Sequence, residues 1–288
     1  MSFAGDAIIC VFMADKNSAG ELEEMACCRN AIQCAEEIKN YSSVDLNSHV
    51  AVSYGEICFA ILGGHESQWT YLINGECLTE LADALNDAAS REAVATATCF
   101  AKAHFDKSDI KVTEISGKDS VKIIKVIKND HEKDCNSEES RSKFNLMFAE
   151  LHHFVPSPVC AAVAAGSFDV LSELRQVTTL FLKLDSYSRE KNKDLLSLQS
   201  FYLGVQKYLA DMGGFMRQFL VDDKGCVLIA LWGVPGTNHP NNCSRALHCG
   251  VSIRNFCKTI DHQCSIGLTT GDAYCGTVGS EIRKDYVA

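Results

Sequence analysis

The sequence lacks any long hydrophobic run and any long basic stretch. Its longest apolar runs, such as residues 7–14, have the length of a strand, whereas a membrane-spanning helix needs about 20 apolar residues. The 37 acidic and 27 basic residues give a net charge of −10, and no stripe of Lys and Arg stands out, so we expect no nucleic-acid partner. The N-terminus lacks a basic region followed by a long apolar segment, which argues against secretion and predicts a cytoplasmic protein.

Paired CxxC motifs, which mark structural zinc sites, are also missing. The 15 cysteines are scattered through apolar patterns, where cysteine behaves as a small buried hydrophobe. Without a secretory signal we interpret them as reduced thiols. Two clusters combine metal-binding residue types, namely Cys27, Cys28 and Cys34, and His239, Cys243, His248 and Cys249. Both fall at expected helix starts, so we predict no zinc site.

One pattern occurs twice in the chain. The first copy opens with Phe-Ala-Gly-Asp at residues 3–6, and the second contains Asp-Lys-Gly-Cys at residues 223–226. Each copy continues with a helical stretch and an apolar strand that ends in Gly55-Glu56 or Gly271-Asp272. Each then reaches a glycine, Gly63 or Gly279, which lie 216 positions apart. Because 288 residues suffice for two domains, the repeat predicts two similar domains with different roles.

The first domain is expected over residues 1–105 and contains two amphipathic helices. Apolar residues at helical spacing predict these helices over 21–41 and 75–89. Strands are expected over 7–13, 49–54 and 57–62, and the last two should pair antiparallel across Gly55-Glu56. A connecting segment, 106–172, contains an alternating run over 121–127 that predicts a strand. The lysines from Lys118 to Lys128 favour a solvated edge strand over a membrane-facing helix, and a mobile loop is expected over 129–143.

The second domain is expected over residues 173–288. It should contain a buried strand over 177–182, a helix over 195–212 that ends at Gly213-Gly214, and a hairpin of 215–220 with 227–232 turned by 222–225. A helix over 244–258 and strands over 264–268 and 273–278 follow. This order predicts an α+β fold made of two ferredoxin-like domains (βαββαβ) rather than a parallel sheet.

The repeated pattern resembles the class III nucleotide cyclases. The residues that carry the resemblance are Phe-Ala-Gly-Asp-Ala (3–7), Ser-Glu-Leu-Arg-Gln-Val-Thr (172–178), Asp-Lys-Gly-Cys (223–226), Ile-Gly-Leu-Thr-Thr-Gly-Asp-Ala-Tyr-Cys-Gly-Thr-Val-Gly (266–279) and Arg-Lys-Asp-Tyr (283–286). Within this family the chain is most similar to the tandem catalytic domains of the bicarbonate-regulated soluble adenylyl cyclases. The resemblance covers both domains and implies that they pair about a pseudo-twofold axis.

The resemblance also implies a metal-dependent reaction. In the family, two aspartates of one domain hold two magnesium ions, which act on ATP to give cyclic AMP and pyrophosphate. Asp6 corresponds to one of these aspartates. By itself, Asp6 is equally well explained as a turn residue, and the repeat and the resemblance together favour the metal role. In the second domain the corresponding residues are Cys226 and Lys183, so this domain is expected to hold no metal.

Other family positions differ in this sequence. The resemblance implies nucleotide contacts at Phe3, Gly5, Gln218 and Val287. The family reads adenine with Lys and with Thr or Asp where this chain has Gln218 and Val287, although a shift of one residue would bring Arg217 to the first position. The bicarbonate-binding Lys and Arg correspond to Ser2 and Ala82, neither of which can hold an anion, so no bicarbonate response is expected.

Two functions are therefore open. The family pattern places a second metal aspartate before Met1 and a phosphate-stabilising Asn and Arg after Ala288, so we expect a fragment of an adenylyl cyclase that is inactive alone. The alternative is a non-catalytic pseudo-cyclase that binds a nucleotide or regulates another chain.

Overall fold

The computed structural model shows two compact units. Unit 1 comprises residues 1–58 and 74–135, and unit 2 comprises residues 59–73 and 136–288. The residues that the structure describes are 2–4, 7–14, 21–41, 47–127, 152–155, 159–160, 172–185, 195–222, 225–279 and 284–287. The short segment 59–73 thus belongs to unit 2, although it lies within the first sequence repeat. The limits of the two cyclase-like domains remain a prediction.

Unit 1 contains a mixed four-stranded sheet in the order β3–β6–β8–β7. Its strands are β3 (Val50–Val52), β6 (Ala93–Thr96), β7 (Ile110–Glu114) and β8 (Ser120–Val126). β3 and β6 are parallel, whereas β8 is antiparallel to both of its neighbours. The helices are α1 (Glu21–Asn40), α2 (Glu76–Asp87) and α3 (Ala97–Ala103), and β1 (Ser2–Ala4) pairs with β2 (Ala7–Ile9) in a separate hairpin.

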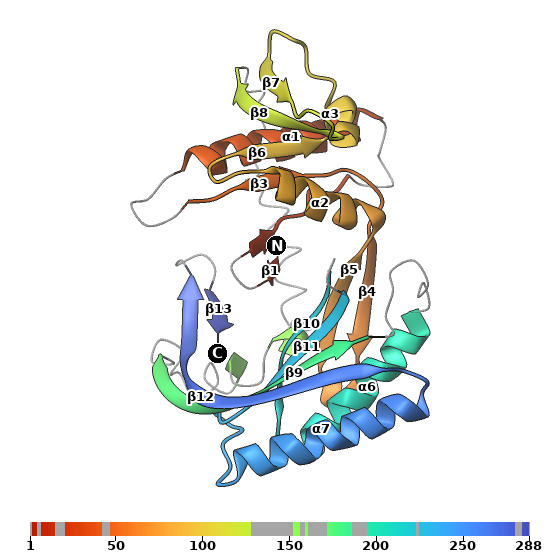
Figure 1. Ribbon diagram of the computed structural model, residues 1–288, viewed down its shortest axis with the longest axis vertical. Helices are drawn as coiled ribbons and strands as arrows, with labels where there is room; N and C mark the ends of the chain where they lie inside the picture. The colour runs from red at the N-terminus through yellow and green to blue at the C-terminus, as the bar shows by residue number, and fades with distance from the viewer. Residues whose placement is uncertain are drawn as a thin grey trace. The chain divides into compact units, whose positions relative to one another are not determined.

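The core of unit 1 follows from the alternation of β6. Ala93 and Ala95 face Ile32 of α1 in one buried cluster, and all three are fully buried. Val94 is fully buried as well and, by the period of two, points to the other face. Because α2 packs on β3 and β6, the sheet has helices on both faces (Figure 1).

Unit 2 contains an antiparallel five-stranded sheet in the order β10–β11–β9–β12–β13. Its strands are β9 (Glu173–Leu184), β10 (Phe215–Asp222), β11 (Gly225–Trp232), β12 (Cys264–Gly279) and β13 (Lys284–Val287). With α6 (Leu195–Asp211) and α7 (Asn242–Thr259), the chain order is the βαββαβ of a ferredoxin-like fold. Both helices lie on the same side of this sheet (Figure 1).

Helix α6 is held by a continuous apolar stripe. Its buried apolar residues recur at helical spacing and are Leu198, Phe201, Tyr202, Val205 and Leu209. The chain leaves the helix at Gly213, two residues after Asp211, where a φ of 66° is the left-handed conformation that glycine adopts without strain. The amide of Gly214 donates to the carbonyl of Leu209 at 2.8 Å, which closes the last turn.

The segment 59–73 packs into unit 2 as a two-stranded hairpin. Its strands are β4 (Cys58–Gly63) and β5 (Trp69–Asn74), joined by the short helix η1 (His65–Ser67). Leu62 and Leu72 are buried in the same cluster as Leu180 and Phe201. An element of the first repeat therefore completes the hydrophobic core of unit 2.

The four predicted helices and the hairpin of the second repeat are confirmed. α1, α2, α6 and α7 begin and end within two residues of the expected positions. In the hairpin, Asp222 pairs with Gly225 across the predicted turn. The mixture of helices and strands confirms the α+β class. The predicted loop over 129–143 lies outside the described residues.

Several strand predictions were wrong. β3 and β4 lie in different sheets instead of forming a hairpin across Gly55-Glu56. The chain here passes close to the start of α2, because a Cβ on Gly55 would lie 2.8 Å from Cys77 Cβ. β12 is one strand rather than two, since Gly271 and Asp272 each pair with a residue of β9 and leave no room for a turn.

In the first repeat, β2 is shorter than the expected 7–13, and β1, β5, β6 and α3 were not predicted at all. In the expected connecting segment, β7 was not predicted either. The run over 121–127 forms β8 as expected, but β8 lies between β6 and β7 and is not an edge strand. Within the described part of the chain, no helix is both long and apolar enough to cross a bilayer.

Candidate functional site

The first candidate region lies where the β10–β11 hairpin meets the end of β9. Gly225 opens β11 with a φ of 109°, a backbone conformation that favours glycine. A Cβ at this position would lie 3.9 Å from Cε of Lys183. The side chain of Lys183 therefore extends along the start of β11, at the place where the sequence predicts the unequal residues of the repeat.

Lys183 and Cys226 point to opposite faces of the sheet. Cys226 pairs with Leu184, and Lys183 pairs with Val227. Leu184 and Cys226 are fully buried beneath the helices, whereas Lys183 is exposed. An ammonium group on one face and a buried thiol on the other do not fit magnesium, which prefers hard oxygen ligands gathered around one point.

A carboxylate that the sequence analysis did not select lies two residues beyond Lys183. Asp185 is exposed, and its Oδ2 accepts a hydrogen bond of 2.6 Å from the hydroxyl of Ser265. Its amide donates to the carbonyl of Gln263. Asp185 thus joins the ends of β9 and β12, and only the three-dimensional pairing of these strands reveals this role.

Gln218 lies on the exposed face of the sheet with Lys183. It pairs with Ile229 of β11, which pairs in turn with Phe181 of β9. The β10–β11 register shifts between Met216 and Gln218. Arg217 is the residue at this bulge, and bulges of this kind redirect side chains.

The other predicted nucleotide and anion positions are spread over the chain. The backbone of Val287 pairs with Gly276, next to the Cys275–Glu173 pair at the far end of β9 from Lys183. Ala82 is half-buried in α2 of unit 1. Ser2 and Phe3 contribute backbone to β1, which pairs with β2 on either side of Gly5 and Asp6. Gly5 and Asp6 themselves lie outside the described residues.

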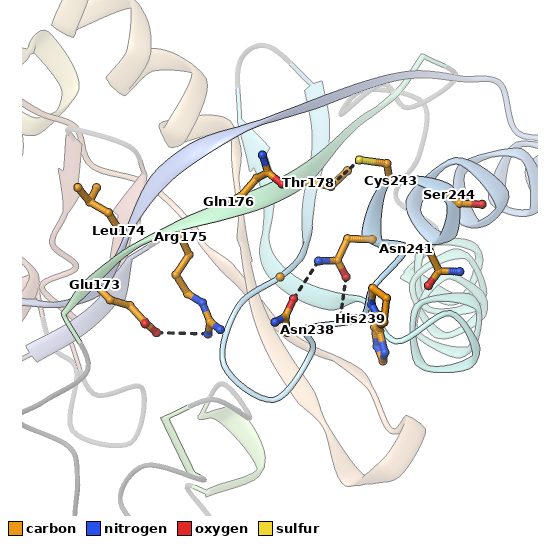
Figure 2. A pocket seen from close by; sticks show the side chains of 13 residues that line it. Glu173, Leu174, Arg175, Gln176, Thr178, Asn238, His239, Asn241, Cys243 and Ser244 are labelled. Carbon is orange, nitrogen blue, oxygen red and sulfur yellow. Dashed lines mark hydrogen bonds and ion pairs between the residues drawn. The ribbon is translucent and has the colours of Figure 1, made fainter.

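The second candidate region is a cavity at the other end of β9. It has a volume of about 540 Å³ and lies between the start of β9, the loop after β11 and the first turn of α7. Arg175, Thr178, Asn238 and Cys243 are among its lining residues (Figure 2). Arg175 Nη1 lies 3.2 Å from Glu173 Oε1. The cavity is therefore polar and contains one compensated cation.

Metal-binding groups are not assembled in the part of the chain that the structure describes. No group of three or more His, Cys, Asp or Glu residues is placed to hold an ion there. The described cysteines of the two predicted clusters are free thiols.

Comparison with known proteins finds relatives among the adenylate cyclases. No protein-family model matches the sequence. Human adenylate cyclase type 10 is 22% identical over 319 residues, which cover 99% of this chain and 19% of the human protein. The rabbit (Oryctolagus cuniculus) protein is also 22% identical and covers the same shares. These matches support a class III nucleotide cyclase.

This chain spans about a fifth of the length of the curated relatives that it matches (19%). Among solved structures, a bacterial light-regulated adenylyl cyclase is 16% identical and aligns over 52% of this chain and 47% of its own, with a TM-score of 0.42. The guanylyl cyclase Cya2 is 23% identical over 41% of this chain and 64% of its own, with a TM-score of 0.36. Class III cyclases depend on magnesium in general.

Proposed function

We propose that this chain is part of an adenylyl cyclase, which converts ATP to cyclic AMP and pyrophosphate. The observation that carries the proposal is the match to adenylate cyclase type 10 over 99% of the chain. It supports ATP rather than GTP as the substrate, because the curated relatives are named for that activity. The reaction would serve intracellular signalling, and we place the protein in the cytoplasm.

In this proposal the two repeats have different roles. Asp6 is the residue that would hold magnesium, and the ion would activate the ribose hydroxyl and polarise the α-phosphate of ATP. The second repeat would hold no metal, because Lys183 and Cys226 occupy the corresponding positions. It would contribute nucleotide contacts through Gln218 and Val287, with Phe3 and Gly5 beside Asp6. One aspartate does not replace two, so we expect no turnover from these 288 residues alone.

The hairpin of residues 59–73 supports pairing of the two repeats within one chain. Gln199 of α6 donates to the carbonyl of Gly63 at 2.7 Å and accepts from its amide at 2.9 Å. Gln206, about two turns further along α6, donates to the carbonyl of Gln68 at 3.0 Å. A helix of the second repeat thus recognises the backbone of a first-repeat hairpin, as expected of domains that share one working site.

A second function is favoured by the same positions of unit 2. The buried thiol of Cys226 and the ammonium of Lys183 exclude magnesium there, and neither Gln218 nor Val287 is a residue that the family uses to read adenine. These differences fit a non-catalytic pseudo-cyclase that binds a nucleotide and acts on another chain.

Measuring ATP binding and cyclic AMP formation with and without magnesium separates the two functions. For an enzyme, a longer protein that contains these residues and supplies the second aspartate forms cyclic AMP with magnesium, and Asp6→Asn abolishes this turnover, while the control Asp185→Asn leaves it unchanged because Asp185 is held by Ser265. For a pseudo-cyclase, the longer protein binds ATP without turnover, and Asp6→Asn has the same affinity for ATP. A chain that neither binds nor converts ATP contradicts both functions.

A further inference from the structure

Asn74 and Gly75 form the only Asn-Gly pair in the sequence. Asn74 is the last residue of β5, and Gly75 is the N-cap residue of α2. The pair lies where the chain leaves the hairpin segment 59–73 and enters unit 1 again. Both residues are half-buried, so water reaches them. Neither residue enters the proposed function.

The side-chain amide of Asn74 contacts the backbone nitrogen of Gly75. This nitrogen donates a hydrogen bond of 2.9 Å to Oδ1 of Asn74. Oδ1 is bonded to Cγ, which is the carbon that the next backbone nitrogen attacks when an asparagine side chain closes into a five-membered ring. The side chain of Asn74 is therefore already folded back on the nitrogen with which it would react.

Close packing explains why residue 75 is a glycine. A Cβ on Gly75 would lie 2.4 Å from the carbonyl oxygen of Glu56 and 3.4 Å from Cα of Ile57, so a larger residue does not fit beside this stretch of chain. Glycine also leaves the backbone nitrogen uncrowded and the local backbone free to adopt the conformation that ring closure needs. The packing that requires glycine at this position thus also makes Asn74 reactive.

Asn47 of unit 1 provides a contrast. It is more exposed than Asn74 and precedes another small residue, Ser48. Its Oδ1, however, accepts a hydrogen bond of 2.6 Å from Nε of Arg91. A partner 44 positions away thus holds this side chain, whereas the partner of the Asn74 side chain is the nitrogen of the next residue. Exposure alone therefore favours Asn47, and geometry favours Asn74.

We propose that Asn74 is a modification site at which water and the chain's own backbone convert the asparagine to isoaspartate in the folded protein. The Gly75 nitrogen loses its proton to water and bonds to Cγ of Asn74, while the bond from Cγ to Nδ2 breaks and Nδ2 takes up a proton and leaves as ammonia. Water then opens the succinimide ring. Cleavage between the Gly75 nitrogen and Cγ gives aspartate, whereas cleavage between this nitrogen and the backbone carbonyl carbon of Asn74 gives isoaspartate, in which the main chain passes through Cβ.

Isoaspartate alters the connection between β5 and α2. It lengthens the main chain by one carbon–carbon bond, about 1.5 Å, directly before a glycine that has no room even for a Cβ beside Glu56. The start of α2 must therefore move, and the hydrogen bond of 3.1 Å from the amide of Leu78 to the carbonyl of Gly75 should weaken. The aspartate product keeps the path of the chain and adds a negative charge near the N-terminus of α2, which the helix dipole tolerates well.

The experiment incubates the full reduced chain at mildly alkaline pH, labels isoaspartate with an isoaspartyl methyltransferase and maps it by peptide mass spectrometry. Isoaspartate should accumulate at Asn74 at least about tenfold faster than at Asn47. Asn74→Gln should abolish this signal, because glutamine would have to close a six-membered ring, and the matched change Asn47→Gln should retain it. A rate at Asn74 that does not exceed the rate at Asn47 by this factor overturns the proposal.

A synthetic peptide with the sequence of residues 70–79 shows how fast the Asn-Gly pair reacts without the fold. The rate in the folded chain should lie within about tenfold of the peptide rate, and a slower reaction means that the fold protects Asn74, which overturns the proposal. Hydrogen exchange tests the effect on α2. The amide of Leu78 should exchange faster in the aged chain than in Asn74→Asp, which has the same charge without the longer backbone, and equal exchange would contradict the predicted shift of α2.

Discussion

At the scale of single residues, the sequence predicts which side chains occupy the family's positions but not which way they point. Cys226 and Lys183 were assigned from the resemblance to the cyclase family, and both lie where β9 pairs with the start of β11. Their placement on opposite faces depends on the register of the strands, because a shift of one residue would turn a side chain to the other face. Asp185 was missed for the same reason, because its partner Ser265 is 80 positions away in sequence.

Substitution by aspartate tests the environments of these two residues. Cys226→Asp should lower the free energy of unfolding by about 2–4 kcal/mol, since a carboxylate in the fully buried core is desolvated without a partner. The matched change Lys183→Asp at an exposed position should alter the free energy of unfolding by less than about 0.5 kcal/mol. Urea denaturation measures both. The double variant should gain no stability from magnesium, and a clear gain would show that the two side chains share one site after all.

At the scale of elements, the sequence predicts helices well and short strands poorly. α1, α6 and α7 have apolar stripes long enough to fix the helical period. β6 has only four residues, three of which are Ala, Val and Ala. It forms a strand because it is buried between β3 and β8. Such a strand has no local pattern that distinguishes it from a helix.

No local sequence pattern predicts which elements the β4–β5 hairpin packs against. We expect its attachment to depend on Gln199 and Gln206, which bind the backbone of the hairpin. The double change Gln199→Ala and Gln206→Ala should lower the free energy of unfolding by about 2–4 kcal/mol, because it leaves half-buried backbone groups unpaired.

Hydrogen exchange should locate this effect. The amide of Gly63, which donates to Gln199, should exchange faster in the double variant, while that of Gly64 should change least, because it donates to the carbonyl of Gln68 within the hairpin. Ser200→Ala on the exposed side of α6 is the control, since its hydroxyl bonds only to Leu196 of the same helix. Equal exchange at Gly63 in all three proteins would contradict the proposed role of the glutamines.

At the scale of the whole molecule, the sequence predicts two domains but not how the chain is divided between the compact units. The repeat assigns residues 59–73 to the first domain, whereas packing places them in unit 2. Leu62 and Leu72 explain the difference, because their side chains fill the core that also contains Leu180 and Phe201. A repeat in sequence records duplication, whereas a compact unit records which apolar surfaces are buried together.

Two core substitutions should show that the units unfold separately. Leu72→Ala removes a side chain from the core of unit 2, and Ile32→Ala removes one from the core of unit 1; each should cost about 2–5 kcal/mol in its own unit. Hydrogen exchange measures this directly. Leu72→Ala should reduce protection of β9 amides and leave those of β6 unchanged, and Ile32→Ala should do the reverse. If either change lowers protection equally in β6 and β9, the chain unfolds as one cooperative body, and the hairpin joins the two repeats into a single folding unit.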